Sequence, residues 1–149
     1  MTAQPLLDVS DLTVEFTTRR GIVKAVQHVN ISVGKGETVG IVGESGCGKS
    51  TTARLLMHLM TRDAGDIIYD GRQVGPALSL RDLRRGVQMV FQDSYASLNP
   101  RLTIEESIAF GPKVHGMADD TARTLARELL GKVGLRPEIF ANRDRKSVV

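Results

Sequence analysis

Eight consecutive residues match G-x-x-x-x-G-K-[ST], the pattern of a loop that cradles phosphate groups. They are Gly43, Glu44, Ser45, Gly46, Cys47, Gly48, Lys49 and Ser50, and Thr51 follows them. The three glycines can adopt positive φ and have no Cβ, so consecutive backbone N–H groups can turn inward around a phosphate chain. Lys49 adds a mobile charge for the β- and γ-phosphates, Ser50 is the expected Mg²⁺ ligand, and Thr51 is expected to add a second hydroxyl.

The elements on either side of this loop must position it. Residues 37–42 read as a short buried strand, with glycines at 34 and 36 in the turn before it. After the loop, apolar side chains recur with helical spacing at Ala53, Leu56, Met57 and Met60. The helix would point its positive end at the phosphates. Strand, loop and helix favour a phosphate site over a glycine-rich turn without a ligand.

Composition restricts the class of protein. The chain has 149 residues, of which 41% are hydrophobic and 25% charged, as in a single globular domain. The net charge of +3 is spread over scattered basic pairs and only 4% of residues are aromatic, which argues against nucleic acid as a partner. The single cysteine indicates a reducing compartment. No signal peptide is evident and no apolar stretch approaches ~20 residues, so a membrane role would need a partner.

Strand patterns precede the loop. Near-alternation of apolar residues predicts a strand over 6–16, with a slip near Ser10 and Asp11, and a second strand over 22–33 after a turn. Beyond the helix, Asp70-Gly71 between apolar segments predicts a hairpin. A short helix over 78–85 and a buried strand over 87–91, which ends at Gln92, complete this half.

Helix signals dominate the remainder. Thr103 followed by Glu106 is a capping box, which predicts a helix that runs to about Phe110 and stops at Gly111-Pro112. A longer helix should begin at Asp119-Asp120 and end at Gly134. Its buried face is expected to carry Ala122, Leu125, Leu129 and Val133.

Three stretches together resemble the ATP-binding subunits of ABC transporters, and among them the oligopeptide/dipeptide importer group. They are 43–51 (GESGCGKST), 65–71 (GDIIYDG) and 87–101 (VQMVFQDSYASLNPR). The most specific feature is a strand-ending glutamine, Gln92, placed 43 residues after Lys49 and followed by Ser-Leu-Asn-Pro-Arg at 97–101. The similarity extends over residues 6–143.

The resemblance implies an α/β fold: a P-loop NTPase core with an antiparallel β subdomain and the start of a helical subdomain, an incomplete ABC ATPase domain over residues 1–143. It implies that Gln92 contacts Mg²⁺ or the attacking water and acts in catalysis. It also implies that Phe16 stacks on adenine. From the residues alone, a solvated glutamine and a core phenylalanine remain alternatives.

The same resemblance implies ATP and Mg²⁺ as cofactors and ATP hydrolysis coupled to import of peptides or similar small solutes. Expected partners are transmembrane permease subunits, a second ATP-binding subunit and, indirectly, an extracytoplasmic solute-binding protein. The expected location is the cytoplasmic face of the cell membrane.

Three parts of the family pattern are absent: an LSGGQ-type signature, a strand ending in Asp-Glu, and a switch histidine. We therefore expect no ATP hydrolysis by these 149 residues, and exposed apolar surface where parallel strands lack neighbours. Residues 144–149, Asp-Arg-Lys-Ser-Val-Val, resemble a translated sequencing adapter and are interpreted as a non-native tail. Alternative hypotheses are a non-hydrolysing nucleotide-binding or regulatory module, a non-functional truncation product, or a small kinase, against which the β-rich N-terminus argues.

Overall fold

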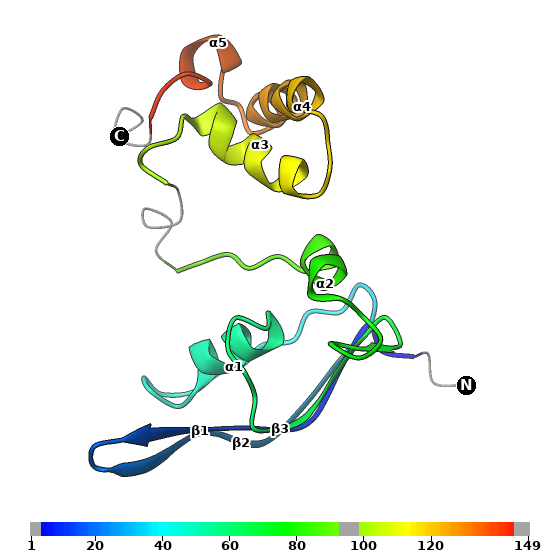
Figure 1. Cartoon of the computed structure of the whole chain (residues 1–149), viewed down its shortest axis with the longest axis vertical. Helices are drawn as coiled ribbons and strands as arrows, with labels where there is room; N and C mark the ends of the chain where they lie inside the picture. The colour runs from blue at the N-terminus through cyan, green and yellow to red at the C-terminus, as the bar shows by residue number, and fades with distance from the viewer. Residues whose placement is uncertain (1–3, 93–98, 145–149) are drawn as a thin grey trace. The chain divides into compact units, whose positions relative to one another are not determined.

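The computed structural model describes residues 4–92 and 99–144, and the chain divides into two compact units, 1–89 and 90–149 (Figure 1). The first unit contains β1 (Leu7–Thr18), β2 (Gly21–Val33), α1 (Lys49–Leu56), β3 (Ala64–Tyr69), β4 (Arg72–Gln73) and α2 (Leu80–Gly86). The second contains α3 (Ile104–Val114), α4 (Asp119–Lys132) and α5 (Pro137–Phe140). Most of the sequence segment 93–101 and of the tail at 144–149 lies outside the described residues.

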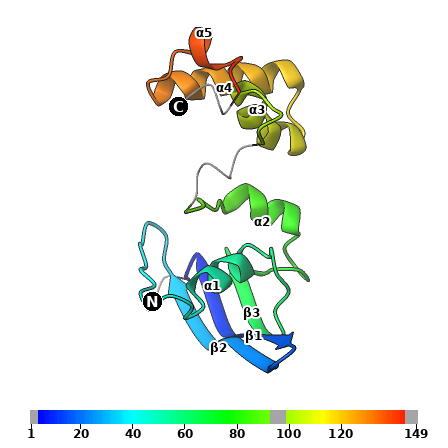
Figure 2. The ribbon, with the colours of Figure 1, turned by 90° about the vertical axis from the view of Figure 1, so that its left-hand side faces the viewer.

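The first unit is built on a four-stranded antiparallel sheet with the order β2-β1-β3-β4 (Figure 2). The two strands predicted before the phosphate loop are confirmed as β1 and β2. The predicted hairpin is confirmed as β3 and β4, where Asp70 (φ 48°) and Gly71 (φ 73°) both adopt the left-handed conformation. Such a turn matches the twist of the two strands.

The slip predicted near Ser10 and Asp11 is a β-bulge. The register of β1 shifts between Val9 and Leu12 against β2, and between Ser10 and Thr13 against β3. Asp11 takes a positive φ of 55°, and its Oδ1 lies 2.5 Å from Nδ1 of His28. The bulge lets Val9 and Leu12 both face the core despite their odd spacing, because an extra residue restores the alternation.

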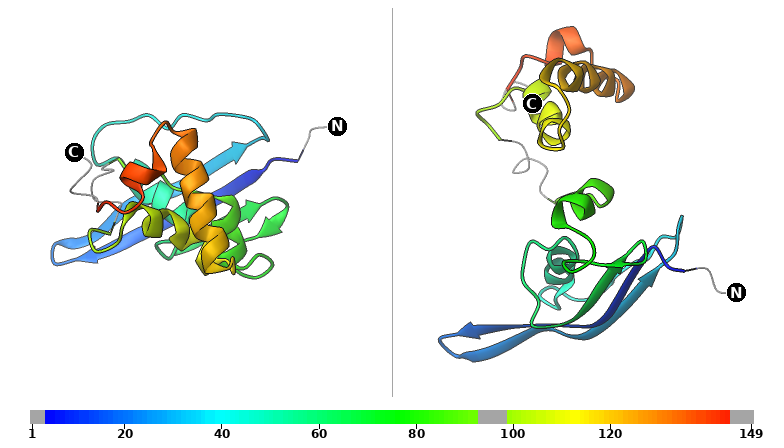
Figure 3. Two further views of the ribbon diagram at one scale, coloured as in Figure 1. Left: turned by 90° about the horizontal axis from the view of Figure 1, so that it is seen from above. Right: turned by 45° about the vertical axis from the view of Figure 1, so that its right-hand side comes forward.

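The core of the first unit lies on the face of the sheet that α1 covers (Figure 3). The buried side chains come from the sheet, α1, α2 and the segment before α2: Val9, Leu12, Val14, Val26, Leu55, Ile67, Val74, Leu78 and Leu83. α1 buries Thr52 and Leu55 and ends at Leu56. Of the predicted stripe, Leu56 and Met60 are confirmed as half-buried residues that pack against this core, whereas Ala53 and Met57 are not among the residues of the core. The buried face of α1 is centred on Thr52 and Leu55, because α1 packs on β2.

Two predicted strands are wrong. Residues 37–42 and 87–91 form no strand, and Val42 and Val90 are 96% and 93% exposed. A parallel strand is stable only between neighbours that pair with its backbone and cover both of its faces. Among the described residues, neither segment belongs to the sheet. The expectation that these segments expose apolar surface is confirmed.

The second unit packs α3 against α4. Small side chains at Ala109, Ala122 and Ala126 allow the helices to approach closely, and Leu130 packs with Ile104. Leu129 and Val133 remain 38% and 72% exposed. The predicted face is therefore wrong at these two positions: the buried residues of α4 are spaced by four, and alanine rather than leucine sets the contact.

The capping box at the start of α3 is confirmed. Thr103 Oγ1 accepts from the backbone N–H of Glu106, and a Glu106 carboxylate oxygen accepts from the N–H of Thr103 at 2.9 Å. The predicted end at Phe110 is wrong, since α3 runs through Pro112 to Val114. Proline removes one backbone hydrogen bond in the last turns, and packing of α3 on α4 holds the helix across it.

A buried carboxylate links the two helices. The Glu105 side chain is 3% exposed, and its oxygens accept from Arg123 Nη1 at 3.0 Å and Arg127 Nε at 2.5 Å. The hydrogen bond from Arg127, supported by that from Arg123, holds the pKa of Glu105 below its ordinary value although burial opposes this. The charged carboxylate therefore stabilises the helical unit.

Glu105→Gln is expected to lower the free energy of unfolding of the second unit by about 1–2 kcal/mol at neutral pH, because the bonds to arginine lose their charge. Glu128→Gln, an exposed change on α4, is the matched control. A lowered folded-state pKa gives stability that is present above about 4.3, the ordinary glutamate pKa, and is lost as the pH falls through the folded value. In urea unfolding of the full chain, the free energies of unfolding of the wild type and of Glu105→Gln should converge as the pH falls. A difference that stays constant with pH would contradict the role of the Glu105 carboxylate.

Candidate nucleotide-binding site

The phosphate loop turns sharply where its glycines require it. Gly46 (φ 84°) and Gly48 (φ 97°) adopt the left-handed conformation, and α1 begins at Lys49 immediately afterwards. Gly43 does not have positive φ, so its role is different. A Cβ built on Gly43 would lie 2.5 Å from Sγ of Cys47, so glycine allows the loop to close on itself. These turns bring residues 43–48 into one compact curve before the helix.

Gly48 also fixes the loop against the sheet. A Cβ at this position would lie 2.5 Å from the carbonyl oxygen of Ala25 and 3.6 Å from Cγ2 of Val26, both on β2. The start of α1 therefore rests directly on the backbone of β2. This contact joins the loop to the rigid part of the first unit, which an anion-binding helix N-terminus needs.

Lys49 reaches back over the loop. Its Nζ donates hydrogen bonds to the carbonyl oxygens of Gly43 and Glu44, both at 2.7 Å, and lies 3.5 Å from Sγ of Cys47. The ammonium group is thus held by the curve of the loop itself. Phosphate oxygens are charged acceptors and bind an ammonium group more strongly than peptide carbonyls do. A phosphate group placed beside Lys49 would therefore offer its ammonium group a stronger acceptor than the two carbonyls do.

The hydroxyl residues that follow divide into two roles. Ser50 is exposed at the start of α1, and Thr51 is partly buried beside it. Thr52 is 5% exposed, and its Oγ1 donates to the carbonyl oxygen of Gly48 at 3.0 Å. Sequence reasoning missed this buried threonine. Its position four residues after Gly48 was the signal, because a threonine hydroxyl in a helix can bond to the carbonyl four residues back.

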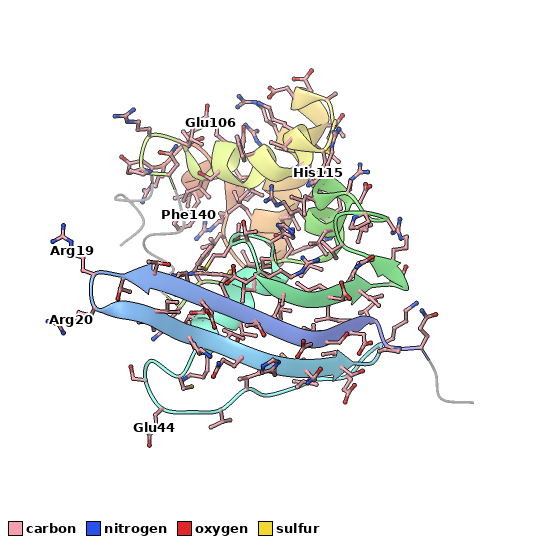
Figure 4. All side chains as sticks on the ribbon, turned by 60° about the horizontal axis from the view of Figure 1, so that its bottom comes forward. Arg19, Arg20, Glu44, Glu106, His115 and Phe140 are labelled. Carbon is pink, nitrogen blue, oxygen red and sulfur yellow. The ribbon has the colours of Figure 1, made fainter. Side chains whose placement is uncertain are left out.

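The donor set fits Mg²⁺ bound with a nucleotide. Magnesium keeps most of its waters and takes one or two protein oxygens together with phosphate oxygens. The exposed Ser50 hydroxyl, next to the lysine that would pair with the phosphates, is a suitable oxygen donor. Glu44, Ser45 and Cys47 are exposed on the loop. Figure 4 shows Glu44 at the same end of the sheet as Arg19 and Arg20, in the β1–β2 turn.

Phe16 and Gln92 were predicted from the family resemblance. Phe16 lies on β1, is 36% exposed, and shares a face of the sheet with the buried Val14 two residues earlier. Gln92 is exposed and belongs to the second unit, so it is described apart from the loop. It does not end a strand. The roles of both residues, and those of the loop residues toward nucleotide, stay predictions.

The sequence of this chain was compared with those of known protein families and proteins. The family model described as "ABC transporter" matches residues 26–147. The chain is 44% identical over 145 residues to the oligopeptide transport ATP-binding protein OppF of Bacillus subtilis, covering 94% of this chain and 47% of that protein. It is 43% identical over 146 residues to the glutathione import ATP-binding protein GsiA of Pectobacterium atrosepticum, covering 91% and 23%. The chain thus spans less than half the length of these relatives.

A solved structure supports the same assignment. A dimeric ATP-binding cassette in a post-hydrolysis state, bound to ADP and Pi, aligns with a TM-score of 0.77 and 25% identity, over 96% of this chain and 63% of that one. The chain belongs to the ABC transporter family. The predicted fold class, part of an ABC ATPase domain, is confirmed. None of the helices in residues 4–92 and 99–144 has the length and hydropathy needed to cross a bilayer.

Proposed function

We propose that the chain is the nucleotide-binding part of the ATP-binding subunit of an ABC importer for peptides or similar small solutes. The observation that carries the proposal is the placement of Lys49 in the curve of the loop, with Gly48 seated on β2. The names of the relatives, which are oligopeptide and glutathione import proteins, support the solute class.

In this proposal the backbone N–H groups of residues 43–51 and the Lys49 ammonium hold the phosphates of ATP, and Ser50 holds Mg²⁺ with them. Magnesium, when bound, neutralises phosphate charge and orients the γ-phosphate. Gln92 contacts the metal or the attacking water, and Phe16 stacks on adenine. Complete turnover requires a second ATP-binding subunit and permease subunits at the cytoplasmic face of the membrane, with a solute-binding protein on the other side.

We further propose that residues 1–149 bind ATP without hydrolysing it. Phosphoryl transfer depends on groups that position water and metal, and the sequence has no LSGGQ-type signature, no strand-ending Asp-Glu and no switch histidine. We expect ATP to bind weakly to this chain. The phosphate loop directly follows residues 37–42, which are exposed and form no strand that could hold the loop in place.

Calorimetric titration of the full chain with MgATP, MgADP and AMP tests the binding site. We expect AMP to bind most weakly, because it lacks the β- and γ-phosphates that Lys49 would contact. Release of phosphate from ATP should stay at the background of the buffer. Equal affinity for AMP and ATP would refute a phosphate-reading site, and phosphate transfer to another acceptor would favour the kinase alternative.

A chimera tests the importer assignment. Residues 6–143 would replace the matching segment of Bacillus subtilis OppF, to which the chain is 44% identical. We expect the chimera to restore oligopeptide uptake to cells that lack OppF. A chimera that hydrolyses ATP in purified form but gives no uptake would contradict the peptide assignment while leaving the ATPase assignment intact.

A further inference from the structure

The phosphate loop carries one negative side chain that the proposed function does not use. Within residues 38–53, Lys49 and Glu44 are the only charged side chains. Glu44 is exposed, and it contacts the Lys49 ammonium group through its carbonyl oxygen rather than through its carboxylate. Figure 4 shows the Glu44 side chain at the edge of the loop, directed away from the sheet. Within the part of the chain that the structure describes, no cation pairs with this carboxylate.

The Glu44 carboxylate lies near any phosphate that Lys49 binds. Nζ of Lys49 is 2.7 Å from the carbonyl oxygen of Glu44. Standard bond lengths place a glutamate carboxylate at most about 7 Å from the carbonyl oxygen of the same residue. The carboxylate is therefore within about 10 Å of the Lys49 Nζ in every rotamer, which is about one Debye length at 0.1 M salt. Two unit charges about 10 Å apart in water change a binding constant about twofold.

We propose that the Glu44 carboxylate makes the loop selective for nucleotide complexed with Mg²⁺ over free nucleotide. The inference rests on the proposed function and gives a specificity role to a side chain that holds no phosphate. Lys49 attracts both forms, and it attracts the free form more strongly because that form carries more negative charge. Mg²⁺ cancels two of the charges of a triphosphate. Repulsion by Glu44 grows with the charge that remains, so it opposes the free form more than the magnesium complex.

Asp8 provides a matched control for the change in net charge. It lies on β1 opposite Ser32 of β2, seven residues along β2 from Ala25, against which the loop rests. At about 3.3 Å per residue, these two points on β2 are roughly 20 Å apart. The neighbouring Val9 faces the core, so Asp8 lies on the other face of the sheet. Asp8→Asn therefore removes the same charge from the same unit as Glu44→Gln does, but far from the loop.

The test compares the affinities of the full chain for ATP in excess Mg²⁺ and for ATP in the presence of a metal chelator. At about 0.01 M salt, we expect Glu44→Gln to raise the affinity for free ATP about threefold more than that for MgATP, since free ATP carries two more charges. Tripolyphosphate, which has phosphates but no base, should show the same difference. Asp8→Asn, and Glu44→Asp, which keeps the charge, should leave the ratio of the two affinities at its wild-type value. At about 1 M salt, where the Debye length is about 3 Å, the ratio in Glu44→Gln should return to that value.

Four results would overturn the role of Glu44 while leaving the phosphate site in place. They are an unchanged ratio in Glu44→Gln at low salt, an equal change in Asp8→Asn, a change that persists at high salt, and a selective loss of MgATP binding in Glu44→Gln. The last of these would show that the carboxylate binds the metal instead of repelling the phosphates. A wild-type chain that binds neither form of ATP would overturn the proposed function, and the selectivity with it.

Discussion

Lys49→Ala is expected to weaken MgATP binding to the chain by on the order of 10²-fold, and to lower ATP turnover by about 10²–10³-fold in a complete subunit that carries the same change. The side chain is the one charged group that the structure holds within the curve of the loop in residues 43–49, on the carbonyls of Gly43 and Glu44. Alanine removes this charge while keeping the helix propensity of the position. Calorimetric titration and an ATPase assay measure the two losses.

The fold should tolerate this change. The hydrogen bonds of Lys49 are to its own loop, and its side chain takes no part in the core of the first unit. The free energy of unfolding should therefore change by about 0.5 kcal/mol or less. Lys35→Ala is the matched control: it removes an exposed lysine paired with Asp70 at 3.6 Å in the same unit. If Lys35→Ala weakens MgATP binding as much as Lys49→Ala does, Lys49 acts only through the net charge of the chain.

Elements specified by neighbouring residues could be predicted from the sequence. The Asp70-Gly71 turn needs two positive φ angles, which this dipeptide readily supplies. The capping box of Thr103 and Glu106 satisfies two backbone donors within four residues. The bulge near Asp11 was visible as a break in alternation. In each case the interactions that decide the structure join residues close together in the chain.

Elements that depend on distant partners were mispredicted. Residues 37–42 and 87–91 have the composition of buried strands, yet composition cannot supply the neighbouring strand that would pair with them. The buried face of α4 includes Ala126, because its small side chain lets α3 approach closely. A prediction that places large apolar residues on the buried face chooses Leu129 instead, which is exposed. Pro112 stays helical for the same reason: contacts with another helix outweigh a local signal.

In the candidate site too, the features set by neighbouring residues could be predicted, and those set by distant residues could not. The motif identified the loop, and the structure places Lys49, Gly46 and Gly48 in a shape suited to phosphate. The contact of Gly48 with Ala25 spans 23 residues and depends on a bulge that the sequence pattern of β2 does not reveal. The loop itself could therefore be predicted from the sequence, whereas its contact with β2 could be found only in the structure.

Gly48→Ala is expected to lower the free energy of unfolding of the first unit by about 2–5 kcal/mol, because two costs add at this position. Alanine at φ 97° is strained, and its Cβ would meet the carbonyl oxygen of Ala25 at 2.5 Å. That oxygen belongs to strand backbone and cannot rotate away as a flexible side chain would. The start of α1 must therefore move off β2, which also displaces Lys49.

Gly46→Ala separates strain from contact. Gly46 has a similar φ of 84°, but a Cβ there would meet nothing within 4 Å. This variant should cost only about 1–2 kcal/mol, the strain of a left-handed alanine. Urea unfolding of the full chain measures both changes, and titration with magnesium tripolyphosphate measures what each does to the loop. Equal destabilisation by the two variants would show that the seat of the loop on β2 contributes nothing to stability. The expected excess for Gly48→Ala, joined to a loss of tripolyphosphate binding, would show that β2 holds the phosphate loop in its binding conformation.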